Sequence, residues 1–249
     1  MKKILVLLLT VITASSCLAQ EEQKAPSPAS QAYHHYRKYK TNPPYGLEKV
    51  QQLIKDKTIR REDPDADAGT DSLPEKLYRS LSFREKFTYN MIYGESYAQT
   101  CDIDEAVVDE EKKIFGNLHS LFSEEAWGDR QDAFFKDNKD SVIALMTESI
   151  GRVNRVGLNY KHAIVDINAT SMIPLLIDMY NLQKKDHDIL TVLLLLMKNN
   201  KYPPFMGSIS YEKLYAGKDT YYDRSLVFNS ANEALIIQRA TDFYNGLSK

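Results

Sequence analysis

His162 and Asp166 are the two residues whose types and spacing come nearest to a chemical site. They stand four residues apart in a segment with helical spacing, so their side chains share one face. That arrangement suits a metal pair or a histidine oriented as a general base, although it equally suits a surface hydrogen bond. A metal site requires a third and a fourth ligand, and the sequence offers no obvious ones. We therefore expect no metal and no other cofactor, with His162 and Asp166 as weak metal candidates.

Acidic residues flank a predicted turn at 94–104, where Glu95, Asp102 and Asp104 stand close together in the sequence. Paired carboxylates can hydrolyse glycosides at a suitable separation, but spacing along a chain does not supply that separation. The whole sequence contains no G-x-S-x-G, G-x-x-x-x-G-K, H-E-x-x-H, C-x-x-C or G-x-G-x-x-G motif. The sequence therefore leans away from an enzyme, and a hydrolase is the least favoured of three roles.

The remaining histidines fall in less informative places. The run Tyr-His-His-Tyr-Arg-Lys-Tyr-Lys at 33–40 places two histidines side by side, where they serve one metal poorly. Its basic and aromatic residues could contact an anionic cell-wall polymer, but we favour a solvated, partly ordered arm that packs a few tyrosines on the domain. His119 has no visible partner, and His187 lies between two aspartates at a predicted helix start.

The segment 201–224 is the most suggestive of binding, because it combines aromatic and basic residues with turn signals and little helical period. Tyrosine and arginine are favoured in protein interfaces, and aromatic loops also bind sugars. The structural alternative is a long connection whose tyrosines cover a buried helix. The candidate binding residues are Tyr202, Phe205, Tyr211, Tyr215, Tyr221, Tyr222 and Arg224.

Helix signals dominate the chain from Ser72 onward. Pairs of a serine and a glutamate three residues apart, which cap helix starts, begin at Ser72, Ser82 and Ser230. The predicted helices cover residues 46–57, 82–100, 104–124, 141–156, 159–168 and 234–244. The one β-like stretch is 221–228.

Residues 189–197, Ile-Leu-Thr-Val-Leu-Leu-Leu-Leu-Met, are apolar on nearly every side. A helix of this kind is buried all round, and nine residues are too few to cross a bilayer. We therefore expect the central helix of the fold here.

A longer stretch around this helix, residues 171–200, resembles one HEAT-type helical repeat unit. Such units pair an amphipathic helix containing an I-P-x-L-I-like run, here Ile173-Pro-Leu-Leu-Ile177, with a second helix that opens after an acidic turn. The second helix here lacks the arginine that the family has near its start, and no second copy aligns elsewhere. The resemblance implies stacked helix pairs that bind other proteins along a concave face.

The first 19 residues have the features of a secretory signal peptide. Lys2 and Lys3 precede an apolar run over 4–12, and small residues follow. Cleavage before Cys17 would leave a lipid-bearing cysteine and an outer-membrane lipoprotein, whereas cleavage after Ala19 would release the chain into the periplasm. Either cut takes the net charge from −2 to −4, which together with export argues against a nucleic-acid partner.

These observations predict three regions. Residues 1–19 form the signal peptide, 20–72 a flexible arm and linker with one short helix, and 73–249 an all-α domain of about eight helices, arranged as a HEAT-like superhelix or an orthogonal bundle. We expect an exported bacterial envelope protein that binds another envelope protein without catalysis, and an inhibitor or an immunity-like protein is one form that this role could take. A module that binds cell-wall or host glycan is the alternative, and membrane contact would come only through Cys17.

Overall fold

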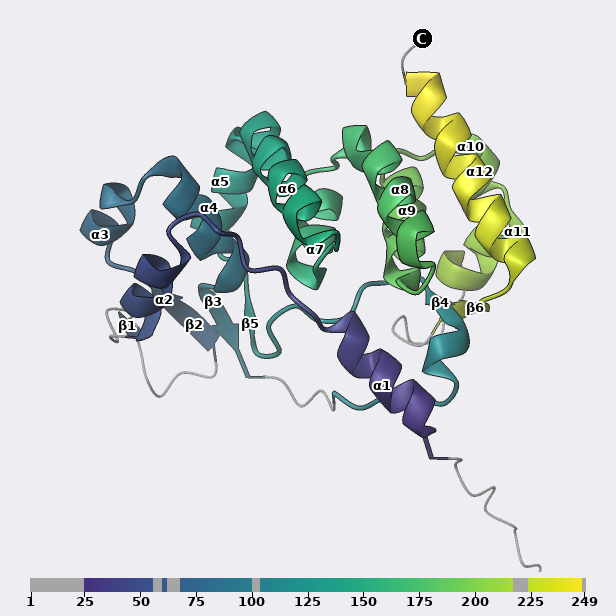
Figure 1. The fold of residues 1–249 in the computed structure, drawn as a ribbon, viewed down its shortest axis with the longest axis horizontal. Coiled ribbons are helices and arrows are strands. Elements are labelled where there is room, and N and C mark those ends of the chain that lie inside the picture. Colours follow the sequence, from purple (N-terminus) through teal and green to yellow (C-terminus); the bar gives the residue numbers. More distant parts are fainter. Residues whose placement is uncertain (1–24, 56–59, 62–67, 100–103, 217–223, 248–249) are drawn as a thin grey trace, which may run out of the picture.

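The computed structural model describes residues 25–55, 60–61, 68–99, 104–216 and 224–247. These residues form mostly helices, with two small antiparallel sheets along one side (Figure 1). The longer helices are α1 (Pro28–Arg37), α2 (Leu47–Lys55), α3 (Glu75–Ser80), α4 (Phe83–Ile92), α5 (Asp129–Asp137), α6 (Lys139–Val153), α7 (Leu158–Asp166), α8 (Ile173–Gln183), α9 (His187–Asn199) and α12 (Ser230–Leu247). The shorter ones are η1 (Glu110–Lys112), η2 (Thr170–Met172), α10 (Pro203–Met206), α11 (Ile209–Tyr211) and η3 (Glu212–Ala216).

The predominantly helical character is confirmed, but the expectation of a purely all-α domain is wrong. One sheet has the strand order β1-β2-β3-β5 and the other pairs β4 with β6. The strands are β1 (Arg60–Arg61), β2 (Ala68–Ser72), β3 (Ser96–Ala98), β4 (Lys113–Phe115), β5 (Glu125–Ala126) and β6 (Ser225–Val227). Five of these six strands are two or three residues long, too short for the period of two that marks a strand in sequence, and β2 (Ala-Gly-Thr-Asp-Ser) has no alternation of apolar and polar residues.

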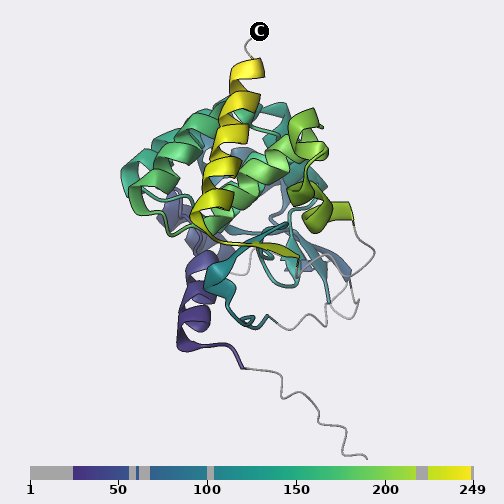
Figure 2. The same ribbon diagram turned by 90° about the vertical axis from the view of Figure 1, so that its right-hand side faces the viewer.

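Helix α9 is the centre of the fold, as its sequence predicts. All residues from His187 to Met197 are buried, and α9 packs against α7, α8, α12 and β4. Figure 2, which faces the α12 end, shows α12 crossing over α8 and α9. The free energy of burying so many leucines holds these neighbours together, at about 1.5–3 kcal/mol for each fully buried side chain.

The predicted helix over 104–124 is wrong. Asp109 has a left-handed backbone (φ 54°), which a continuing α-helix does not tolerate, and the chain then turns through η1 into β4. Strand β4 pairs with β6, in register Ile114 to Leu226, and both of these side chains are buried. Of the apolar residues at helical spacing, only Ile114 lies in this ribbon, whereas Val107, Leu118 and Leu121 lie in the connections on either side of it.

The segment expected to be a flexible arm differs from that expectation, since it carries two helices packed on the body. Val50 of α2 is fully buried, and Tyr33, His34 and Arg37 of α1 are buried too. The connection between the two helices is clamped to the start of α7, where the Asn159 Nδ2–H group donates to the Thr41 carbonyl at 2.8 Å. Helix α1 is thereby fixed beside η1 (Figure 1).

Candidate functional site

Charged side chains are buried where α1 meets η1 and the first turn of α9. The Arg37 guanidinium donates to Glu110 Oε1 through Nη1 at 2.8 Å and to Asp188 Oδ1 through Nε at 3.0 Å. All three residues are buried, and the guanidinium also lies 4.2 Å from the centroid of the Phe115 ring. Because a buried charge without a partner is costly, these three side chains depend on one another.

The electrostatics keep Asp188 and Arg37 ionised. Burial alone would raise the pKa of the Asp188 carboxyl, but the Arg37 guanidinium and then the Lys161 ammonium hold it below its usual value. Burial alone would likewise lower the pKa of Arg37, and Asp188 raises it instead. Lys161 forms a second buried ion pair next to the first, with its Nζ 2.6 Å from Asp186 Oδ1.

A second group of side chains joins the cluster through His34. Its Nδ1 lies 3.1 and 3.2 Å from the two carboxylate oxygens of Glu110, and its Nε2 lies 3.1 Å from Asp104 Oδ1. His119 Nε2 lies 2.8 Å from the same Asp104 oxygen. The two imidazole rings meet edge to face, with centroids 5.1 Å apart. Residues far apart in the sequence thus converge on one point.

Asp104 is ionised at this point. Burial acts to raise the pKa of its carboxyl, but the hydrogen bond from the Lys38 ammonium, followed by the charges of His119 and His34, lowers it below the usual value. Lys38 bonds to Oδ2, so Oδ1 remains directed at the two histidines. The arrangement therefore presents one carboxylate oxygen and two imidazole nitrogens to a common space.

His162 lies behind His119 and supports it. A carbonyl only accepts, so His162 Nε2–H donates to the His119 carbonyl oxygen, at 2.7 Å. Burial lowers the pKa of His162, which keeps the ring neutral, and burial also raises the pKa of Asp166 to about 6. Among the described residues, the side chains spaced to hold one metal ion are those of His34, Asp104 and His119, without His162 or Asp166.

The acidic residues of the 94–104 turn have separate surroundings. Glu95 is buried, and its carboxylate accepts from the Tyr89 hydroxyl at 2.7 Å and from the Arg130 guanidinium. Asp102 lies outside the described residues. Asp104 faces the histidines. Glu95 and Asp104 therefore belong to different clusters, and Glu95 forms a structural ion pair.

The aromatic residues of the 201–224 segment divide into an inner and an outer set. Phe205 and Tyr215 are buried. Tyr202 and Tyr211 are half-buried, with the Tyr202 ring 5.2 Å from the Phe243 ring and the Tyr211 ring 5.3 Å from the Tyr215 ring. The inner set covers the end of α9 and holds residues 201–216 against the core.

The end of the same segment runs into β6. Arg224 is half-buried, and its carbonyl oxygen accepts from the Gly116 N–H at 2.9 Å, which extends the β4–β6 ribbon. Tyr221 and Tyr222 lie outside the described residues, as does Cys17, the candidate for lipidation.

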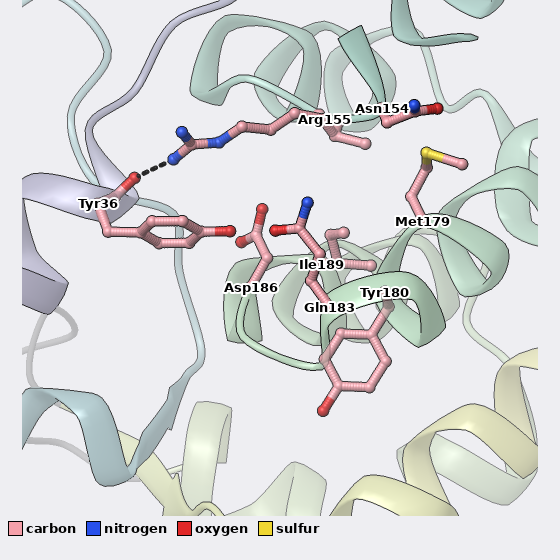
Figure 3. Close-up of a pocket in the computed structure, with 9 residues that line it drawn as sticks. Tyr36, Asn154, Arg155, Met179, Tyr180, Gln183, Asp186 and Ile189 are labelled. Carbon is pink, nitrogen blue, oxygen red and sulfur yellow. Dashed lines mark hydrogen bonds between the residues drawn. The ribbon is translucent and has the colours of Figure 1, made fainter.

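Two hollows in the surface lie near α1. In the first, Figure 3 shows the Tyr36 hydroxyl pointing toward Asp186, while Arg155 donates to the Tyr36 carbonyl at 2.9 Å. Its volume of about 10 Å³ has room for about one water molecule. The second is an open groove of about 370 Å³ whose lining includes Tyr33, Phe228 and the lysines 184 and 185. Only the groove is large enough for an organic ligand.

Comparisons with protein-family models, with curated proteins and with solved structures found no match. None of the described helices is both long and apolar enough to cross a membrane. The interpretation of the sites therefore depends on the residues of this chain alone.

Proposed function

We propose that this protein is exported to the bacterial cell envelope and acts there by binding another envelope protein, without catalysis. Its location would be the periplasm, or the outer membrane if Cys17 carries a lipid. An inhibitor or immunity-like partner of a secreted hydrolase is one form of this role. The support comes from the signal-like first 19 residues and from the surface around the 201–224 segment.

One observation carries the proposal. Ile209 and Val227 are 71% and 66% exposed, the two highest values among the exposed large hydrophobic side chains of the described residues. They lie just before and just after the stretch 212–224, within or beside the segment that the sequence singles out for binding. Isolated exposed hydrophobic side chains are ordinary, but a pair that brackets an aromatic and basic segment favours a binding surface.

The described part of the segment, residues 201–216, is held against the core, which favours tight binding. The Tyr215 hydroxyl donates to the Gly116 carbonyl at 2.8 Å, and the buried Phe205 ring packs at right angles to the Tyr215 ring. A surface that is already ordered loses less conformational entropy when a partner binds. The inner aromatic residues thus support the exposed ones.

Strand β6 supplies a second element of the surface. It pairs with β4 and, among the described residues, with no other strand, and an unpaired strand edge is a common place for an extended segment of a partner to bind. The α8–α9 hairpin beside it is compatible with the resemblance to a HEAT-type protein-binding unit, and that finer description of the fold is part of the proposal.

A pull-down from cross-linked native envelope tests the proposal. We expect Ile209→Ser and Val227→Ser to lose a partner that the wild-type chain captures through a C-terminal tag. Leu182→Ser on α8 is the matched control, because Leu182 is 61% exposed and lies outside this surface. Equal capture by all variants would contradict the proposed surface. The mass of the recovered chain also decides between a lipid on Cys17 and cleavage after Ala19.

The groove near α1 favours glycan binding as a second candidate function. Its Tyr33 and Phe228 rings offer aromatic surface, and Lys184 and Lys185 could contact an anionic polymer. This role predicts retention on insoluble cell-wall sacculi and its loss in Lys185→Gln. Complete flow-through of the wild-type chain would exclude glycan binding of this kind.

A further inference from the structure

We infer that His34, Asp104 and His119 form a binding site for one divalent transition-metal ion of the zinc type, with Glu110 as the outer carboxylate that orients His34. This inference is independent of the surface around the 201–224 segment. The sequence alone shows no group of three metal ligands around any histidine, and the fold brings such a group together here.

The three ligand atoms lie in one place. His34, His119 and Asp104 each offer one ligand atom, and these three atoms lie within 4.8 Å of one another. Two imidazole nitrogens and one carboxylate oxygen form a common ligand set for zinc, with water in the fourth position. Bonds of about 2.0–2.1 Å in a tetrahedral site place ligand atoms about 3.3 Å apart. The observed 2.8 and 3.1 Å separations from Asp104 Oδ1 need to widen by only a few tenths of an ångström.

The hydrogen bonds of the two rings direct the correct nitrogen at the site. The Glu110 carboxylate only accepts, so His34 carries a proton on Nδ1, which leaves Nε2 as the atom that could bind a metal ion. The Ser120 carbonyl likewise only accepts, and it lies 3.1 Å from His119 Nδ1. Metal binding would displace the Nε2 protons that hydrogen-bond to Asp104 Oδ1 and would direct both Nε2 lone pairs at the same space. Two imidazole nitrogens and a carboxylate oxygen this close together are held either by protons on Nε2 or by a metal ion, and a histidine held by a carboxylate is a frequent partner of a metal ion.

The site joins separate parts of the chain. His34 belongs to α1, Asp104 precedes η1, and His119 lies in the loop after β4. His162 fixes the backbone of that loop through its hydrogen bond to the His119 carbonyl. A bound ion would therefore fasten α1 to the body, and metal binding would raise the stability of the docked helix.

Titration of chelator-treated full-length protein with Zn²⁺ by calorimetry, and with Co²⁺ by visible absorption, tests this inference. We expect one equivalent of either ion and the intense visible bands of four-coordinate Co²⁺. Changing outer partners of metal sites weakens affinity by about 10–100-fold, so losing a ligand in Asp104→Asn or His119→Gln should weaken it by about 100-fold or more. The Asp104 side chain is 38% exposed, so Asp104→Asn preserves the fold.

His35→Gln is the matched control. His35 is exposed on α1 next to His34 and belongs to the same histidine pair in sequence, but it is outside the ligand group. Wild-type affinity in His35→Gln together with loss in Asp104→Asn would support the site. The inference would be overturned if the wild-type chain bound neither ion, if Asp104→Asn bound as tightly as wild type, or if His35→Gln lost as much affinity as Asp104→Asn.

Discussion

Replacement of Arg37 by methionine tests whether charge holds α1 in place. Methionine keeps much of the length and apolar volume of the side chain but removes the guanidinium. Glu110 and Asp188 would then remain buried without their cation, since each is almost inaccessible in the folded chain. The structure therefore predicts a large loss of stability from a single substitution near the N-terminus.

The expected size of the loss follows from the burial of both partners. Removing one member of a buried ion pair costs about 3–5 kcal/mol, because the remaining charge stays desolvated. The Lys161 ammonium still acts on Asp188, which places the expected loss toward the lower end of that range. For a chain of 150–250 residues, about 1 kcal/mol lowers Tm by about 2–4 °C, so Arg37→Met should lower it by about 6–12 °C.

The loss should depend on pH in a defined direction. In the wild-type chain the pKa of Asp188 is depressed, so its contribution to stability is present above the unfolded pKa and disappears as pH falls through the folded pKa. In Arg37→Met, burial without the guanidinium raises the pKa of Asp188, so the penalty is largest at neutral pH and shrinks as pH falls toward about 4. The difference between the two proteins should therefore narrow on acidification.

Thermal unfolding followed by circular dichroism at pH 7 and pH 4.5 provides the assay. Arg152→Met is the matched control, since Arg152 pairs with Glu148 at 2.5 Å but is 58% exposed, and we expect its Tm to stay at the wild-type value. Equal changes in Tm for Arg37→Met and Arg152→Met would refute the reasoning. A penalty in Arg37→Met that grows at pH 4.5 would refute it as well.

Two further substitutions test the packing of α9 and the contact between the α1–α2 connection and the start of α7. Leu193 in the middle of α9 is fully buried, so Leu193→Ala should lower the free energy of unfolding by about 2–5 kcal/mol, measured by urea denaturation. Gly157→Ala should cost about 1–3 kcal/mol, because the new Cβ would lie 2.2 Å from the Thr41 backbone nitrogen. Limited proteolysis of Gly157→Ala should then show faster cleavage near Thr41, while unchanged stability in either variant would contradict the packing described.

The parts of the fold that the sequence predicts are those held by local signals or by continuous apolar surface. Helix α9 is predictable because its leucines are apolar on every side, and the capping box at Ser82 and Glu85 forms as expected at the start of α4. The start of α3 differs, since Pro74 occupies the cap position and no side chain caps that helix. A capping box and an all-apolar helix can be recognised in a single sequence, because each depends on residues that are close together along the chain.

The parts that the sequence does not predict depend on contacts between distant residues. The 104–124 segment has apolar residues at helical spacing, but pairing of β4 with β6 and the left-handed Asp109 override it. His119 shows no partner at helical spacing, because its partners are Asp104, 15 residues earlier in the chain, and His34 of α1. No spacing rule joins residues across such separations, so a single sequence cannot assemble the proposed metal site.

Helix α1 explains most clearly why a docked element can look like a free arm. Its buried residues are Ser30, Tyr33, His34 and Arg37, which is the spacing of one helix face. The buried residues of α1 thus have the spacing of a packed helix. Because most of them are polar, a search for hydrophobic periodicity does not find this helix. Because one carboxylate, Glu110, contacts both Arg37 and His34, the ion pair and the proposed metal site share a single anchor. Charge and metal binding would then act together on the same helix, where apolar surface is scarce.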